Sequence, residues 1–192
     1  MIDGLIVAAG ASSRMPAYKM ILDLAGKPLI ERTVDSLLQV CSRIILVTGW
    51  HADQLASLFA QRSEVELVFN PEYRESMFTS VKTGLPHIRS SRFFFLPGDC
   101  PLVPESVLLA LLKVDAPIVV PTYAGKHGHP VLLRQTVIQQ ILDNPALSSL
   151  REFIEASNPQ EVAVASEGIL IDVDTQADYQ KALAMTQNRN PI

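Results

Sequence analysis

The sequence LIVAAGASSRMPAYK at Leu5–Lys19 joins an apolar run of strand length to a loop of small residues and two cations. Small residues let a backbone approach phosphate oxygens closely, and successive N–H groups form an anion-binding concavity. Arg14 adds a planar fork of donors, and Lys19 adds a point charge. A strand followed by an ordinary polar loop would explain each feature alone, but their combination predicts a loop that binds a polyphosphate.

Two better-known phosphate loops are absent from the sequence. The chain contains neither G-x-x-x-x-G-K-[ST] nor G-x-G-x-x-G. A P-loop NTPase is therefore excluded, and a dinucleotide-binding Rossmann site has no support.

The composition indicates one globular domain. With 48% hydrophobic and 19% charged residues, the 192-residue chain can bury a substantial core. A net charge of −4 with scattered basic residues argues against a nucleic-acid surface, which needs clustered Lys and Arg. We expect a single domain over residues 1–187 and a polar tail at 188–192, either a frayed end or the start of a linker.

The cysteine content and the apolar runs bear on location. Cys41 and Cys100 are too few for a disulfide framework, and no secretory signal is recognisable. The apolar runs are far shorter than the roughly 18 residues of a membrane span. These features favour a reduced, cytoplasmic enzyme that contacts neither membrane nor nucleic acid.

Apolar runs of strand length alternate with helical patterns along most of the chain. The runs are continuously apolar, which is typical of a parallel sheet covered on both faces. We therefore predict an α/β fold with a doubly wound, mostly parallel sheet and helices on both faces. Later strands are expected at 43–48, 65–69, 92–96, 116–120 and 131–133, helices at 28–41, 53–61, 76–85, 104–112, 136–142 and 148–156, a Gly/His loop at 123–129, a hairpin of 161–165 with 168–172, and a last helix capped by Thr175 and Asp178.

Ligands of such sheets bind at the carboxyl ends of the strands. The Gly10–Lys19 loop and the Gly98–Pro101 turn both follow strands directly, so they open into one crevice if those strands are neighbours. A lone Asp in a turn is usually a turn former. Beside a phosphate loop, however, Asp99 is suited to the Mg²⁺ that accompanies a nucleotide, because Mg²⁺ takes one or two carboxylates plus phosphate oxygens.

A second carboxylate is expected from Asp172-Val173-Asp174. Residues 172 and 174 of an extended segment point to the same side, so both can face the crevice. We expect Asp174, which lies nearer to the following loop, to be the second metal ligand in preference to Asp172. The alternative role of Asp174 is to stabilise the start of the following helix.

The segment His127-Gly128-His129-Pro130, taken with Cys100, suggests zinc but lacks the ligand spacing of zinc sites. We expect this loop to contact substrate or to close the site. Trp50-His51 is expected to pack at a helix start. Cys100 is expected to be a buried space filler, because no base lies near it in the sequence.

Six segments carry a further signal when they are taken in order. They are Ala8-Ala9-Gly10-Ala11-Ser12-Ser13-Arg14-Met15 with Lys19, Ala25-Gly26-Lys27-Pro28-Leu29, Asn70-Pro71 followed by Met77, Ser80 and Gly84, Gly98-Asp99-Cys100-Pro101-Leu102-Val103, Gly128-His129-Pro130-Val131, and Asp172-Val173-Asp174-Thr175. The chain thereby resembles the MobA-like nucleotidyltransferases over residues 4–185, and specifically their molybdenum-cofactor cytidylyltransferase branch. No single motif is decisive, but the ordered set is specific.

The resemblance implies a nucleotide-diphospho-sugar transferase-like, Rossmann-type fold. It also implies transfer of CMP from CTP to a phosphorylated acceptor, with molybdopterin favoured, Mg²⁺ as cofactor and a molybdoenzyme as a partner to consider. The residues that it assigns are Arg14, Lys19 and Asp99 for catalysis, Asp99 and Asp174 for the metal, His129 and Pro130 for the acceptor, and Ala8, Ala9, Gly10, Ala11, Ser12, Ser13, Arg14, Lys19, Asn70, Ser80, Gly98 and Asp99 for the nucleotide.

The sequence departs from the family pattern at two positions. Pro16 stands where Gly usually follows Arg-Met, which removes a backbone N–H and fixes φ, and Ser76 stands where Gly usually precedes Met77. The guanylyl branch carries a second Gly at the position of Ala9 and a longer Gly-containing insert before its Lys. The methyl group of Ala9 at the strand's end therefore favours a pyrimidine over a purine.

Three functions stay open from the sequence. The first is a molybdopterin cytidylyltransferase, and the second is a sugar- or polyol-phosphate nucleotidyltransferase with the same fold and chemistry. The third is a non-catalytic nucleotide-binding factor for molybdoenzyme maturation. Pyrophosphate release with each acceptor separates the first two, and nucleotide binding without turnover would favour the third.

Overall fold

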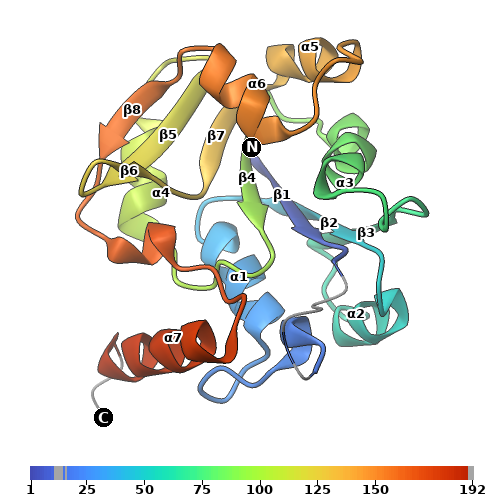
Figure 1. Cartoon of the computed structure of the whole chain (residues 1–192), viewed down its shortest axis with the longest axis vertical. Coiled ribbons are helices and arrows are strands. Elements are labelled where there is room, and N and C mark those ends of the chain that lie inside the picture. Colours follow the sequence, from blue (N-terminus) through green and yellow to red (C-terminus); the bar gives the residue numbers. More distant parts are fainter. Residues whose placement is uncertain (11–14, 16, 190–192) are drawn as a thin grey trace.

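A computed structural model of the chain describes residues 1–10, 15 and 17–189, which form an eight-stranded sheet with helices on both faces (Figure 1). The strands are β1 Asp3–Ala8, β2 Arg43–Thr48, β3 Val65–Phe69, β4 Arg92–Pro97, β5 Ile118–Tyr123, β6 Lys126–His127, β7 Val131–Arg134 and β8 Gln160–Ala163. The helices are α1 Leu29–Leu38, α2 Ala52–Leu58, α3 Met77–Gly84, α4 Glu105–Leu112, α5 Ile138–Leu142, α6 Leu150–Ala156 and α7 Gln176–Arg189, with 3₁₀ helices at Lys19–Ile21, Leu85–His87, Gln135–Val137 and Glu167–Leu170.

The sheet has a parallel half and a mixed half. The strand order is β3-β2-β1-β4-β7-β5-β6, with β8 paired to β5. Strands β3, β2, β1 and β4 are mutually parallel, whereas β7 runs antiparallel between β4 and β5. The predicted α/β fold is confirmed, and the parallel half places β1 directly beside β4.

The side chains of alternate residues in the central strands pack into two separate hydrophobic cores, one on each face of the sheet. In β1, Ile6 and Ala8 face one core, while Leu5 and Val7 face the other. Helices α1, α2, α4 and α7 cover the first core, and α3, α5 and α6 cover the second. Burial on both faces explains why these strands are continuously apolar.

Two predicted elements are wrong. The expected hairpin of 161–165 with 168–172 does not form, because β8 pairs in parallel with β5 and Glu167–Leu170 is a 3₁₀ helix. The expected loop at 123–129 contains a short strand, β6, that pairs antiparallel with the end of β5. Strand β5 continues to Tyr123, beyond the predicted end at 120, and both β6 and β8 pair with this longer strand.

The helix ends follow the predicted capping. The Thr175 hydroxyl accepts from the Asp178 amide at 3.3 Å, and the Asp178 carboxylate accepts from the Thr175 amide at 2.8 Å, which is the reciprocal pattern of a capping box. His51 is the N-cap residue of α2 and packs edge-on against Trp50, as expected for that pair. Within the described part of the chain, every helix is too short or too polar to span a membrane.

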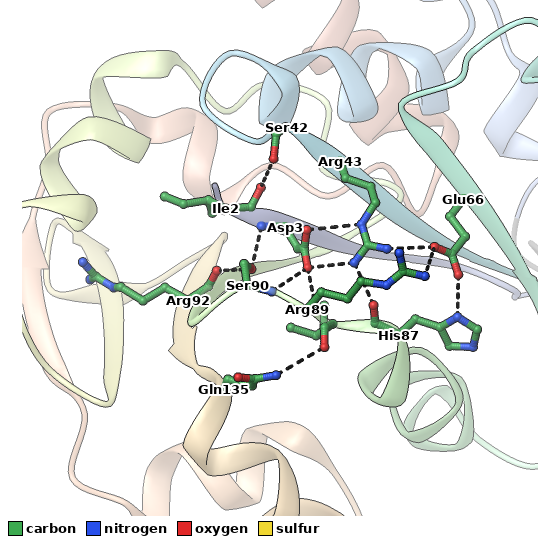
Figure 2. Close-up of polar contacts among 11 residues, drawn as sticks. Ile2, Asp3, Ser42, Arg43, Glu66, His87, Arg89, Ser90, Arg92 and Gln135 are labelled. Carbon is green, nitrogen blue, oxygen red and sulfur yellow. Dashed lines mark hydrogen bonds and ion pairs between the residues drawn. The ribbon is translucent and has the colours of Figure 1, made fainter.

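Buried Asp3 ties together the amino ends of the central strands (Figure 2). Its carboxylate accepts from Arg43 Nη2 at 2.9 Å and from the backbone amides of Arg89 at 2.7 Å and Ser90 at 3.0 Å. Arg43 also donates to Glu66 of β3 at 3.0 Å. Burial alone would raise the pKa of Asp3, but these donors outweigh it and hold the pKa below its ordinary value.

We predict that Asp3→Asn lowers the free energy of unfolding at pH 7 by roughly 3–5 kcal/mol, because it leaves the Arg43 guanidinium without its buried partner. The wild-type contribution is present above the ordinary Asp pKa and is lost as the pH falls through the lowered folded-state value. Urea denaturation at pH 7 measures the difference. Asp115→Asn, which breaks the exposed ion pair with Arg134, is the control and should cost less than about 1 kcal/mol. Equal losses for the two variants would refute the assignment.

Candidate active site

The site lies where β1 and β4 end side by side. The amide of Gly98 donates to Val7 O at 2.9 Å, so the turn after β4 is hydrogen-bonded to the carboxyl end of β1. A Cβ at Gly98 would lie 3.1 Å from Val7 O and 3.0 Å from Ala8 Cβ, so the close approach of the two strands leaves little room for a side chain. Asp99 follows this turn and therefore emerges at the carboxyl edge of the sheet.

Lys19 brings the two predicted metal ligands together. Its Nζ lies 2.7 Å from Asp99 Oδ2 and 2.7 Å from Asp174 Oδ1. The three side chains are largely buried, with 10%, 16% and 26% of their surfaces exposed, respectively. Burial alone would lower the pKa of Lys19, but the two carboxylates outweigh it and raise the pKa, so the ammonium is charged at neutral pH.

Asp174 reaches Asp99 because the chain before α7 is fastened to the turn after β4. The amide of Val173 donates to Asp99 O at 2.9 Å, and the Val173 side chain is fully buried. The residues on either side, Asp172 and Asp174, both line the cavity described below, as their spacing predicted. Burial and the nearby carboxylates of Asp99 and Asp174 raise the pKa of Asp172.

The phosphate loop is described only at its two ends. Gly10 lines the cavity, and Lys19 follows Tyr18, whose hydroxyl donates to Ala8 O at 3.3 Å. The predicted nucleotide contacts at Ala11, Ser12, Ser13 and Arg14, and the departure at Pro16, lie outside the described residues.

The two alanines before Gly10 lie on opposite sides of the sheet. Ala8 faces the core under α1 and is not among the residues that line the cavity. Ala9 lines the cavity, and its carbonyl accepts from the Trp50 amide at 3.1 Å. A Cβ at Gly49 would lie 2.9 Å from Ala9 Cβ and 2.5 Å from Tyr73 Cβ, so these three residues pack tightly at one end of the cavity.

Asn70 and Ser80 form a buried pair behind the cavity wall. Asn70 Nδ2 donates to Ser80 Oγ at 2.9 Å and to Thr79 Oγ1 at 3.0 Å, while its Oδ1 accepts from the Glu72 amide at 2.9 Å. Ser80 lines the cavity, but Asn70 does not. Asn70 therefore fixes the segment between β3 and α3, and its side-chain groups are engaged within the protein.

His129 lines the same cavity as Asp99 and Lys19. Its amide donates to Ile169 O at 2.9 Å, and its ring packs edge-on against Phe95 at 6.0 Å. Its buried Nδ1 has no hydrogen-bond partner among the described residues. Burial lowers the pKa of His129 to about 4, against an opposing effect of Asp99, so the ring is neutral at physiological pH. Pro130 is buried and is not a lining residue.

These groups share one cavity of about 1020 Å³. Charged residues line it at the carboxyl edge of the sheet, with Lys19, Asp99, Asp172 and Asp174, and also on β6 and α6, with Lys126, Arg151 and Glu155. The apolar lining, of which the sequence motifs contain Met77 and Val131, includes Tyr73, Met77, Phe78, Val81, Phe95, Val120, Val131, Leu150, Ile154, Ile169 and Leu170. The spacing of Phe78 and Val81 on one helix face was available as a signal, but it predicts core packing equally well.

The carboxylate pair suits a small hard cation. Asp99 and Asp174 direct one oxygen each at a single position, and Mg²⁺ takes one or two carboxylates and completes its shell with phosphate oxygens and water. Within the described ranges, no group of three or more His, Cys, Asp or Glu side chains is arranged to hold a metal. Cys100 is fully buried, and burial, reinforced by Asp99, raises the pKa of its thiol well above the ordinary value, so it fills space rather than acting as a nucleophile.

Comparisons with known proteins agree with this description. The model of the MobA-like NTP transferase domain matches residues 4–162. The chain is 32% identical over 180 residues to the molybdenum cofactor cytidylyltransferase of Escherichia coli K12, covering 93% of each chain. Among solved structures, Rv0371c of Mycobacterium tuberculosis is 25% identical with a TM-score of 0.82 and coverage of 95% of this chain and 98% of that one. A nucleotidyl transferase from Methanothermobacter has a TM-score of 0.85 at 20% identity and 99% coverage of each chain.

The fold and the carboxyl-edge site define a nucleotidyltransferase of the α/β class. The chain belongs to the MobA-like NTP transferase family, since that domain spans most of its length. The sequence-based resemblance to this family is confirmed.

We predict that His129 makes stability depend on pH. An unfolded histidine titrates near pH 6.5 and the folded one at about 4, so the unfolded chain binds more protons between these values. This contribution to the free energy of unfolding is complete above pH 6.5 and is lost as the pH falls toward 4. His129→Gln should flatten the slope in urea denaturation between pH 4 and 7. An unchanged slope for His129→Gln would show that the ring has the same pKa in the folded and the unfolded chain.

Proposed function

We propose that this chain transfers CMP from CTP to the phosphate of an acceptor, with molybdopterin as the preferred acceptor, and releases pyrophosphate. The observation that carries the proposal is the convergence of Asp99 and Asp174 on one cation position beside Gly10. The 32% identity to the Escherichia coli molybdenum cofactor cytidylyltransferase supports the choice of both substrates.

Asp99 and Asp174 would hold Mg²⁺, which neutralises charge on the triphosphate and on the departing pyrophosphate when it is bound. The donor set fits this ion, because both groups are carboxylates and both reach the same position. Lys19 supplies a further positive charge at the same edge of the cavity, where the β and γ phosphates would lie next to Gly10.

The reaction asks mainly for positioning. An oxygen of the acceptor phosphate forms a bond to the α-phosphorus of CTP, and the bond from that phosphorus to the bridging oxygen breaks, so pyrophosphate leaves with the electron pair. The protein holds the two substrates in line and stabilises the developing charge. Neutral His129 offers a hydrogen-bonding nitrogen on the acceptor side without adding charge.

The cavity favours a large acceptor. Ligand pockets usually measure about 300–1,000 Å³, so a cavity of about 1020 Å³ lies at the upper end of that range. The wall around Phe95, Ile154 and Ile169 is apolar, which suits a flat heterocycle better than a sugar or polyol. This proposal also implies work in the cytoplasm and delivery of the product to a molybdoenzyme.

We predict pyrophosphate release from CTP with molybdopterin and much slower release with sugar or polyol phosphates. Asp99→Asn should reduce kcat by about 10²–10³, because one charged contact to the metal-bound triphosphate is lost. Asp143→Asn, at an exposed carboxylate after α5, is the matched control and should keep wild-type activity. A faster reaction with a polyol phosphate would reassign the acceptor, and activity of Asp99→Asn within a few-fold of wild type would exclude its metal role.

We also predict that kcat/KM is higher for CTP than for GTP or ATP by roughly 10–200-fold, the range expected for a methylene-sized difference in a pocket. Ala9 packs against Gly49 and Tyr73, so the wall cannot recede to admit a purine. Ala9→Gly should reduce the preference for CTP, whereas Ala8→Gly, on the other side of the sheet, should leave the CTP-to-GTP ratio unchanged. A wild-type preference for GTP would overturn the proposed donor.

A further inference from the structure

Lys19 occupies the position that the proposed metal needs. Its Nζ is 2.7 Å from one oxygen of Asp99 and 2.7 Å from one oxygen of Asp174. A Mg²⁺ ion held by the same two oxygens would lie about 2.1 Å from each, in the space that the ammonium fills. Two cations cannot share this position, because their repulsion at such a short separation is large.

The other carboxylate oxygen of Asp99 is a poor alternative for the metal. Asp99 Oδ1 is directed at the Cys100 thiol, with a distance of 3.7 Å to Sγ, and Cys100 is fully buried. The oxygen that faces the cavity is therefore the one that Lys19 already contacts. A metal that binds this oxygen of Asp99 from the cavity has to displace the ammonium.

Lys19 has a new partner within reach when it leaves. Its side chain and Gly10 line the same cavity, and its flexible four-carbon stem lets the ammonium swing while the backbone stays in the 3₁₀ helix. An incoming triphosphate beside Gly10 would offer negative charge at the moment when the metal takes the carboxylates. Each charged group would then keep an oppositely charged partner before and after the exchange.

We propose that Lys19 is a resident counter-ion of the Asp99–Asp174 pair, which the metal replaces only when a nucleoside triphosphate arrives to accept the displaced ammonium. This inference rests on the proposed function, because it uses the same site and the same triphosphate. Its consequence is that the metal alone binds weakly, and that metal and nucleotide strengthen each other's binding. Removal of the Lys19 charge uncouples them.

The test measures Mn²⁺ binding to the full chain by electron paramagnetic resonance in the absence of nucleotide. Lys19→Met should bind Mn²⁺ about tenfold or more tightly than the wild type, because the competing ammonium is gone. Lys126→Met is the matched control, since it removes one positive charge from the wall of the same cavity, and its Mn²⁺ affinity should stay close to that of the wild type. Lys19→Gln, whose amide can still donate to one carboxylate, serves if Lys19→Met does not fold.

A second measurement follows CTP binding with and without Mn²⁺ by calorimetry. We expect Mn²⁺ to increase the CTP affinity of the wild type by about 5–150-fold, and to do so much less in the Lys19 variant. Equal Mn²⁺ affinity in wild type, Lys19→Met and Lys126→Met would overturn the inference, as would equal gains in both Lys variants. Failure of the proposed function looks different, because Mn²⁺ and CTP would remain coupled in the wild type while no acceptor releases pyrophosphate.

Discussion

The site depends on one ammonium group that faces two carboxylates from distant parts of the chain. Lys19 lies 80 residues from Asp99 and 155 residues from Asp174, yet both carboxylates contact it at 2.7 Å. Two structural constraints make this possible. Strand β1 lies beside β4, so the loop and the turn that follow them share one edge of the sheet. The Val173 amide then fastens the segment before α7 to Asp99.

The two halves of the sheet serve different parts of the cavity. Parallel strands β1 and β4 deliver the charged residues at their carboxyl ends, where open α/β sheets bind ligands. The antiparallel insertion of β7 between β4 and β5 places Val131 beside the same cavity, with Val120 from β5 and the segment around His129. Helices α3 and α6 complete the apolar wall from one face. The mixed sheet thus yields a cavity that combines a cluster of charged groups at the carboxyl ends of β1 and β4 with apolar side chains from β5, β7 and α3.

The sequence predicted correctly those strands whose bounds are determined by local apolar patterns. Strands β2 and β3 have the bounds expected from their apolar runs, because both pair in register within the parallel half of the sheet. The hairpin expected at 161–172 failed because β8 pairs with β5, some forty residues earlier, and no local pattern carries that pairing. Lys19 was predicted to serve the phosphates, and its contact with the metal ligands was missed for the same reason. The apolar lining of the cavity could not be separated from core residues, since both show the same periodicity.

Asp3 and Arg43 at the opposite edge show what distinguishes a structural ion pair from an exchangeable one. Asp3 is almost completely buried, and it accepts from a guanidinium and from two backbone amides that have no other position to occupy. No entering cation could satisfy those donors, so the arrangement is permanent. At the carboxyl edge the carboxylates keep 16% and 26% of their surfaces exposed to a cavity, and both contact an ammonium on a flexible stem. The ion pairs of Lys19 with Asp99 and Asp174 can separate without leaving a backbone group unpaired, because all three partners are side chains. A metal could then bind the carboxylates, and a phosphate could bind the ammonium. The fold therefore fixes the amino ends of its strands with backbone donors and leaves the charged groups at their carboxyl ends free to exchange partners.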